Sequence, residues 1–244
     1  WVSYSDIIQL CEGKSVLVSG TIENGYKPTA AQLEAAITPK TKALLYSSPC
    51  NPTGSVFSRE EFAAFVKVLA KNPQILVVAD EIYEHILYDG HKHVAMASLP
   101  GMRERTVTIN GMSKTYSVTG WRVGTIIAPE PITMAIRKVH DFLTVGAPSP
   151  LQRAGVAAYE LPQSYYDKML VDYAERRRLM LAVLDEAQVP YFKPQGAYYV
   201  FTDISKFGYK TDIEFTHYLV KDVGVAVVPG SSFFSRPELG YKYV

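Results

Sequence analysis

The feature that most limits the possible fold is a strand–helix–strand pattern between residues 43 and 79. Residues 43–46 (ALLY) and 75–79 (ILVVA) have the length and composition of short buried strands. The segment between them places apolar residues at the i, i+3, i+4 and i+7 spacing of an amphipathic helix: Phe62, Phe65, Val66 and Leu69. Ser58 and Glu61 form a capping-box pattern at its start. This order predicts a βαβ unit, whose two strands run parallel in a sheet covered by helices on both faces.

Polar residues follow each predicted strand. Asn51 comes after the first strand, and Asp80 and Tyr83 come after the second. A third, β-branched run at 106–109 leads into a turn that carries Lys114. Because the carboxyl ends of parallel strands meet at one edge of a sheet, where ligands collect, these side chains are expected at a common binding site.

Each of these residues also has a simpler interpretation when taken alone. Lys114 can be a solvated charge, and Asp80 can cap the helical segment that follows it. Arg122, eight residues after Lys114, can brace the sheet edge, although a lysine followed by an arginine also suggests a covalent amine site beside an anion site. Asn51 lies in a good turn sequence, and Trp1 can be an ordinary core aromatic. The argument for a site therefore depends on their combination.

The remaining patterns predict an α/β fold with two parts. Residues 1–25 alternate short apolar runs with polar turns, as strand and loop do, and a capped helix is expected from Thr29. Further helices are expected at 131–145, 150–160 and 164–187, with strands around Gly196 and in the VAVVPGSSFF segment, 225–234. We expect a three-layer αβα domain with a mostly parallel sheet over residues 1–160, and a smaller α+β domain over 161–244.

Composition narrows the classes of partner. The net charge of +1 gives no reason to expect nucleic acid or an anionic membrane surface as a partner. No apolar run approaches the roughly 20 residues that span a bilayer. Cys11 and Cys50 are too few for a disulfide framework and lack the spacing of metal ligands. A cytoplasmic protein with reduced thiols and no metal site is therefore expected.

Five motifs occur in a fixed order along the chain: NPTG at 51–54, ADEIYEH at 79–85, SKTYSVTGWR at 113–122, GAYYVF at 196–201 and VVPGSSF at 227–233. In this combination the chain resembles the class I/II aminotransferases, the pyridoxal-phosphate enzymes with the aspartate aminotransferase fold. The bacterial and archaeal branch with aspartate or aromatic specificity is the most similar. The resemblance covers essentially the whole chain and implies the large domain of pyridoxal-phosphate fold type I.

The resemblance implies catalytic roles for three residues. Lys114 is similar to the lysine that holds the cofactor aldehyde as a Schiff base and then moves the substrate's α-proton as general base and acid. Asp80 is similar to the carboxylate that keeps the pyridine nitrogen protonated, which makes the cofactor ring an electron sink. Tyr83 is similar to the residue that approaches the phenolic oxygen of the ring.

The resemblance also implies binding roles. Asn51 is expected near the same phenolic oxygen and near the substrate carboxylate. Ser113 and Arg122 resemble phosphate ligands, and the arginine can use its bidentate fork. Trp1 is similar to the aromatic wall that faces cofactor and substrate.

Two expected parts of the family's site are not found in these 244 residues. One is an upstream helix N-terminus with glycine that cradles the phosphate, and the other is an arginine beyond PGSSF that clamps the α-carboxylate. Arg236 lies too early to take that second role. Both predicted domains are therefore expected to be incomplete, the first at its N-terminal end and the second at its C-terminal end.

These features give one leading hypothesis and three alternatives. The first is a transaminase of the EC 2.6.1 type, which moves an amino group between an L-amino acid and a 2-oxo acid and is expected to be a homodimer. A pyridoxal-phosphate-dependent β-lyase shares every motif named above. A cofactor-sensing transcription regulator would need a DNA-binding module, and no basic stretch of that kind is seen. The last alternative is a cofactor-binding but catalytically inactive piece.

Overall fold

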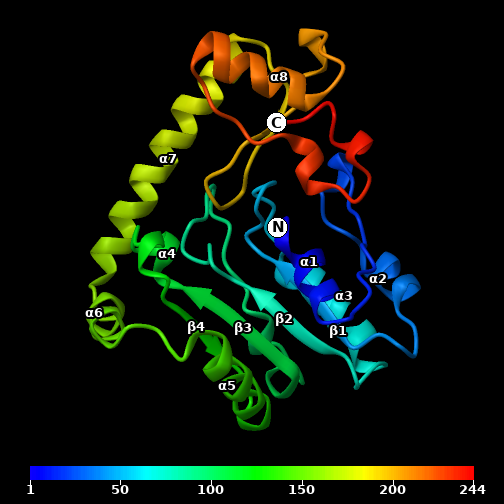
Figure 1. Ribbon diagram of the computed structural model, residues 1–244, viewed down its shortest axis with the longest axis vertical. Coiled ribbons are helices and arrows are strands. Elements are labelled where there is room, and N and C mark those ends of the chain that lie inside the picture. The colour runs from blue at the N-terminus through cyan, green and yellow to red at the C-terminus, as the bar shows by residue number, and fades with distance from the viewer.

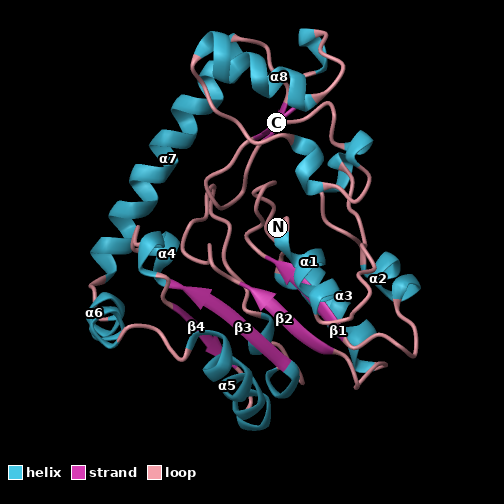
Figure 2. Ribbon diagram, in the orientation of Figure 1, coloured by secondary structure: helices cyan, strands magenta, loops and turns pink.

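The computed structural model describes residues 1–244, and a four-stranded sheet lies at its centre (Figures 1 and 2). The strands are β1 (Ala43–Ser47), β2 (Leu76–Asp80), β3 (Thr106–Gly111) and β4 (Gly124–Ile127), in the spatial order β1-β2-β3-β4. The first three strands are parallel, and β4 is antiparallel to β3. The predicted mostly parallel sheet is therefore confirmed, and the runs expected at 43–46, 75–79 and 106–109 form β1, β2 and β3 within about two residues of their expected bounds.

The helix between β1 and β2 is α3 (Arg59–Ala70). The Ser58 hydroxyl accepts a hydrogen bond from the Glu61 amide at 3.2 Å, and the Glu61 carboxylate accepts one from the Ser58 amide at 2.7 Å. This capping box satisfies two amide groups that the first turn leaves without partners. The buried face of α3 packs against the sheet through four side chains: Phe62, Phe65, Val68 and Leu69. Each such side chain contributes about 1.5–3 kcal/mol by leaving water.

The chain before β1 differs from the prediction of strand and loop. It forms helix α1 (Ser3–Leu10), a 3₁₀ turn at Ile22–Asn24 and helix α2 (Ala30–Ala36), which Thr29 caps as expected. The apolar run at 16–18 forms no strand, and Val16 and Leu17 are exposed. The run pairs with no strand of the sheet, so its β-propensity alone was not sufficient to form a ladder.

The chain after β3 is mostly helical, as predicted. Its helices are α4 (Met112–Thr115), α5 (Glu130–Thr144), α6 (Ser149–Tyr159), α7 (Gln163–Glu186) and α8 (Asp212–Tyr218), which continues as one π-helical turn at Leu219–Val223. Short 3₁₀ turns lie at Thr119–Trp121, Ser205–Phe207, Gly230–Phe233 and Pro237–Leu239, and two more precede β3, at Met96–Ser98 and Arg103–Arg105. Figure 1 shows α7 extending from the end of the sheet near α4 to the region of α8 and the C-terminus. None of these helices combines the length and apolar character needed to cross a membrane.

Strands are scarcer than predicted in the last third of the chain. The antiparallel pair β5 (Tyr191–Phe192) and β6 (Phe201–Thr202) flanks Gly196, which itself forms a single bridge to Leu87. The strand expected from residue 225 is absent; this segment is irregular up to the 3₁₀ turn at Gly230–Phe233. Val225 and Val228 are exposed and Val227 is half-buried, so β-branched composition alone was misleading. The division into domains at 160 stays a prediction.

Candidate active site

The candidate site lies at the carboxyl ends of the three parallel strands. Asn51 lies in the turn after β1, Asp80 is the last residue of β2, and Tyr83 follows in the next turn. Lys114 lies in α4, which begins directly after β3. The register aligns the ends of the strands, because Asp80 is opposite Ser47 on one side and Ile109 on the other. The parallel pairing is thus what brings these segments to one edge.

Asp80 is held by two hydrogen bonds. The Tyr4 hydroxyl of α1 donates to one carboxylate oxygen, and the Ile82 amide donates to the other at 3.2 Å. Burial raises the pKa of Tyr4, and the charge of Asp80 raises it further, so the hydroxyl remains a donor at neutral pH. The carboxylate is therefore oriented before any ligand binds.

Tyr83 and Asn51 meet at the same edge, and both are buried. The Tyr83 hydroxyl lies 2.8 Å from the Tyr199 hydroxyl. Burial, followed by this hydrogen bond, raises the pKa of Tyr83, while an interaction with the Asn51 side chain acts in the opposite direction. Tyr83 is therefore a neutral hydroxyl with two polar neighbours.

Lys114 lies among aromatic rings. Its Nζ is 5.6 Å from the ring centre of Tyr198 and 5.9 Å from that of Tyr83, and the residue is half-buried. The ammonium forms no ion pair with a carboxylate in this structure. Aromatic faces attract a cation without neutralising it. The Lys114 Nζ is therefore held beside Tyr83 without a carboxylate partner.

Ser113 and Arg122 are linked through Thr119. The Thr119 hydroxyl donates to the Ser113 carbonyl at 3.0 Å, and Arg122 Nη1 donates to the Thr119 carbonyl at 3.3 Å. Arg122 is exposed and has a left-handed backbone conformation, with φ of 56°. Its remaining N–H groups have no protein partner, so the guanidinium fork is available to an anion. Arg122 also lines a cavity of about 770 Å³, together with Arg137 and His140.

Trp1 precedes α1, and its carbonyl accepts a hydrogen bond from the Tyr4 amide at 3.3 Å. Its side chain is 53% exposed. The role of an aromatic wall for Trp1 stays a prediction.

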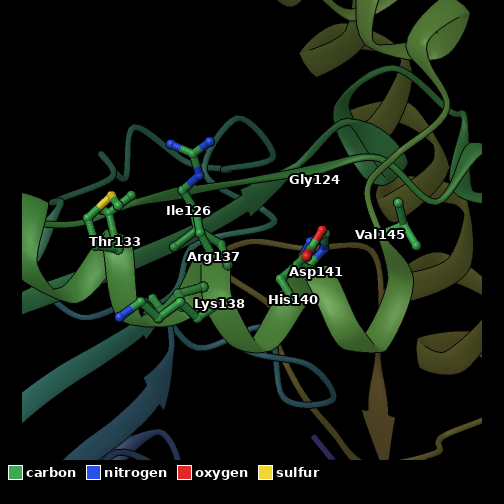
Figure 3. Close-up of a pocket in the computed structure, with 10 residues that line it drawn as sticks. Gly124, Ile126, Thr133, Arg137, Lys138, His140, Asp141 and Val145 are labelled. Atoms are coloured by element: carbon green, nitrogen blue, oxygen red, sulfur yellow. The ribbon is translucent and has the colours of Figure 1, made fainter.

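A second cavity, of about 560 Å³, lies between β4 and α5 (Figure 3). Arg137, Lys138, His140 and Asp141 of α5 line it, with Gly124 and Ile126 of β4. None of the residues predicted for the site takes part. This cavity is therefore separate from the polar cluster at the strand ends.

Two contacts in the candidate site were not predicted from the sequence: those of Tyr4 with Asp80 and of Tyr199 with Tyr83. Tyr4 is 76 residues from its partner and lies in a segment that was expected to be strand and loop. Tyr199 belongs to the GAYYVF motif, which was noted as a motif without a role for this hydroxyl. The motif was thus the only available signal.

Comparison with known proteins places the chain in a family. The family profile "Aminotransferase class I and II" matches residues 1–240. An aspartate aminotransferase of Rhizobium meliloti (strain 1021) is 39% identical, over 100% of this chain and 62% of the relative. An aspartate/prephenate aminotransferase of Cereibacter sphaeroides is 38% identical, over 100% of this chain and 64% of the relative. The crystal structure of an aromatic aminotransferase from Pyrococcus horikoshii superimposes with a TM-score of 0.92 and 36% identity, covering 100% of this chain and 65% of that one.

The chain belongs to the aminotransferase class I and II family. Its fold class is the one predicted, with the αβα layout and mostly parallel sheet of these structural relatives. It spans a little under two thirds of the length of the relatives described above. The activity of the whole protein is therefore a matter for proposal.

Proposed function

We propose that this chain forms the pyridoxal-phosphate-binding part of an aminotransferase, which moves an amino group between an L-amino acid of aspartate or aromatic type and a 2-oxo acid. The observation that carries the proposal is the convergence of Lys114, Tyr83 with Asn51, and a doubly hydrogen-bonded Asp80 at one sheet edge. Relatives named aspartate and aspartate/prephenate aminotransferase support this class of reaction.

The donor set fits pyridoxal phosphate group by group. Lys114 offers an amine with no ion-pair partner to the aldehyde, and Asp80 offers a carboxylate to the pyridine nitrogen. Tyr83 and Asn51 offer a hydroxyl and an amide to the phenolic oxygen. Arg122 offers its unpaired N–H groups to the phosphate, next to Ser113. When bound, the cofactor supplies an electron sink for the bonds at the substrate α-carbon.

Lys114 is the residue that moves protons in this mechanism. An amine takes up a proton only in its neutral form. The Lys114 amine is half-buried among aromatic rings and has no carboxylate partner that would hold it away from a substrate. With the cofactor bound, the flexible side chain would take the proton from the α-carbon of the substrate and hold it at Nζ, as general base and then general acid.

Asp80 and Tyr4 act together at the other end of the ring. A carboxylate beside the pyridine nitrogen favours the protonated form of that nitrogen, because opposite charges attract at close range. The Tyr4 hydroxyl keeps the carboxylate aimed in one direction. Orientation by a neighbouring hydrogen bond limits the cost of ordering the site when the cofactor arrives.

The proposal is tested first on cofactor attachment. The full-length protein with pyridoxal phosphate is expected to show the absorbance band of a lysine-bound cofactor, and borohydride reduction is expected to fix the cofactor to the peptide that contains Lys114. Lys114→Ala removes both signals, whereas Lys67→Ala, an exposed lysine of α3, keeps them. A wild-type protein that binds no pyridoxal phosphate overturns the proposal.

The reaction is then tested by its products. Amino transfer requires a 2-oxo acid acceptor and yields a new amino acid. Release of pyruvate and ammonia without an acceptor identifies a β-lyase instead. A protein that binds the cofactor at Lys114 and forms neither product is a binding protein and not an enzyme. Sedimentation of the full-length protein tests the expected homodimer.

A further inference from the structure

A buried carboxylate–imidazole contact joins His93 to Glu81, which lies in the turn that carries Asp80 and Tyr83. Glu81 is 1% exposed, and its Oε2 is 2.8 Å from Nε2 of His93. The His93 side chain is itself only 14% exposed. The other carboxylate oxygen of Glu81 is buried without a protein partner. A carboxylate so deeply buried depends on its remaining partner, because water does not solvate it.

The main chain of Glu81 is fixed as firmly as its side chain. Its amide donates to the Ile109 carbonyl of β3 at 2.9 Å, and its carbonyl accepts from the Glu84 amide at 2.9 Å. Glu81 is therefore tied to the neighbouring strand, to its own turn and to His93. It is the chain neighbour of Asp80 and lies two residues before Tyr83, so a shift at Glu81 displaces both.

We propose that the Glu81–His93 pair is a positioning element, which fixes the turn at residues 80–83 and thereby aims the Asp80 carboxylate and the Tyr83 hydroxyl at the cofactor ring. The pair touches neither cofactor nor substrate and acts through these two residues. This inference rests on the proposed binding of pyridoxal phosphate. Supporting groups of this kind determine whether a site is held to its productive geometry.

The same region contains three groups of the kind that bind metals. Ligand atoms of Glu81, Glu84 and His93 lie within 4.8 Å of one another. Glu84 Oε1, however, already accepts a hydrogen bond from the Asn110 side chain and lies 3.3 Å from His85 Nε2. These contacts give Glu84 a structural role of its own. We therefore assign the Glu81–His93 contact as a hydrogen-bonded pair and make metal binding an outcome of the test.

The test compares two substitutions of His93 in the full-length protein. His93→Leu removes the partner of Glu81, whereas His93→Gln keeps an N–H group at a similar reach. The readouts are the dissociation constant of pyridoxal phosphate and the circular dichroism of the bound cofactor, which reports the orientation of its ring. His93→Leu is expected to weaken binding about tenfold, the lower end of the effect measured when a residue that orients a metal ligand is removed. It is also expected to change the circular dichroism, and His93→Gln is expected to restore most of both signals.

A matched control separates positioning from general stability. Val68→Ala shortens a buried side chain of α3 that lies in the main core, so it lowers the thermal midpoint. It is expected to leave the cofactor's circular dichroism unchanged. If His93→Leu does not fold, Glu81→Gln takes its place, because it keeps the side-chain shape and removes the charge. The expected result for Glu81→Gln is a change in the same direction.

Three results overturn the inference. If the bound cofactor has the same circular dichroism in His93→Leu and in Glu81→Gln as in the wild type, the positioning role is wrong and the proposed function stands. A wild-type protein without any cofactor band removes the proposed function and this inference with it. If zinc raises the thermal midpoint of the wild type but not that of His93→Gln, the region is a metal site and not a positioning element.

Discussion

Tyr4→Phe is the sharpest single test of how Asp80 is held. The substitution removes one hydroxyl and keeps the ring that packs beside the strand ends. It leaves Asp80 with one hydrogen bond, from the Ile82 amide. A hydrogen bond to a charged group contributes about 1.5–3 kcal/mol. Because Tyr4 and Asp80 are both only half-buried, water can replace part of the lost contact, and we expect the lower end of that range.

The contact exists before the cofactor binds, so its loss weakens binding only by the added cost of ordering Asp80 when the ring arrives. If that cost equals the full value of about 1.5 kcal/mol, binding of pyridoxal phosphate weakens roughly tenfold. The assay is a titration of the full-length apoprotein with the cofactor, followed by absorbance. The matched control is Tyr191→Phe, because the Tyr191 hydroxyl also donates to a carboxylate, that of Asp185, at 2.9 Å on the protein surface. The control is expected to leave the affinity unchanged.

The reasoning fails if Tyr4→Phe binds the cofactor within about twofold of the wild type, a difference of about 0.4 kcal/mol. Such a result means that the Ile82 amide alone orients Asp80, or that the Tyr4 contact is lost when the ring binds. Equal weakening by Tyr4→Phe and Tyr191→Phe points instead to a general loss of stability.

Two further predictions concern stability and follow from local geometry. Gly196→Ala places a Cβ 2.7 Å from Cβ of Pro49, so urea unfolding is expected to show that the free energy of unfolding falls by about 1–3 kcal/mol. Gly120→Ala, whose added Cβ has no atom within 4 Å, is expected to change it little. Equal effects of the two substitutions contradict this prediction. Hydrogen bonding to Arg177 lowers the pKa of Asp89 to about 2, below its usual 3.8. Its contribution to stability is present above about pH 3.8 and is lost as the pH falls towards 2. The wild type is therefore expected to have a larger free energy of unfolding than Asp89→Asn at neutral pH, by at most about 1 kcal/mol for this exposed ion pair. This difference is expected to shrink in acid. A difference that does not depend on pH contradicts the prediction that the Asp89–Arg177 pair is its source.

The parts of the fold that could be predicted are those that local rules determine. The apolar runs that became β1, β2 and β3 are short, continuous and bounded by turns or caps, so their length and composition identified them. The caps at Thr29 and Ser58 were found because a capping box is a pattern within four residues. The runs at 16–18 and 225–228 have a similar composition and formed no strand. Strand formation needs a partner, and a short apolar run does not show whether one exists.

The same distinction applies to the candidate site. Asn51, Asp80, Tyr83 and Lys114 could be grouped in advance, because parallel strands bring the residues that follow them to one edge. Tyr4 and His93 could not, since each reaches its partner from a segment with no strand of its own. Sequence therefore predicts which chemical groups gather at the edge more readily than it predicts what holds them in place.

That difference has a physical consequence for how the site can be altered. Asp80 and Tyr83 lie in one short turn, and the contacts that fix this turn come from α1, from His93 and from Tyr199. Each contact crosses from a different segment, so each can be removed without changing any group assigned to the chemistry. If the contacts act independently, their contributions to the free energy of cofactor binding add, so the fold-changes in the dissociation constant multiply. If they fix the turn as one unit, the first loss accounts for most of the change in the dissociation constant. A double substitution, Tyr4→Phe with His93→Leu, measures which is the case, and an effect close to the product of the two single effects shows independent action.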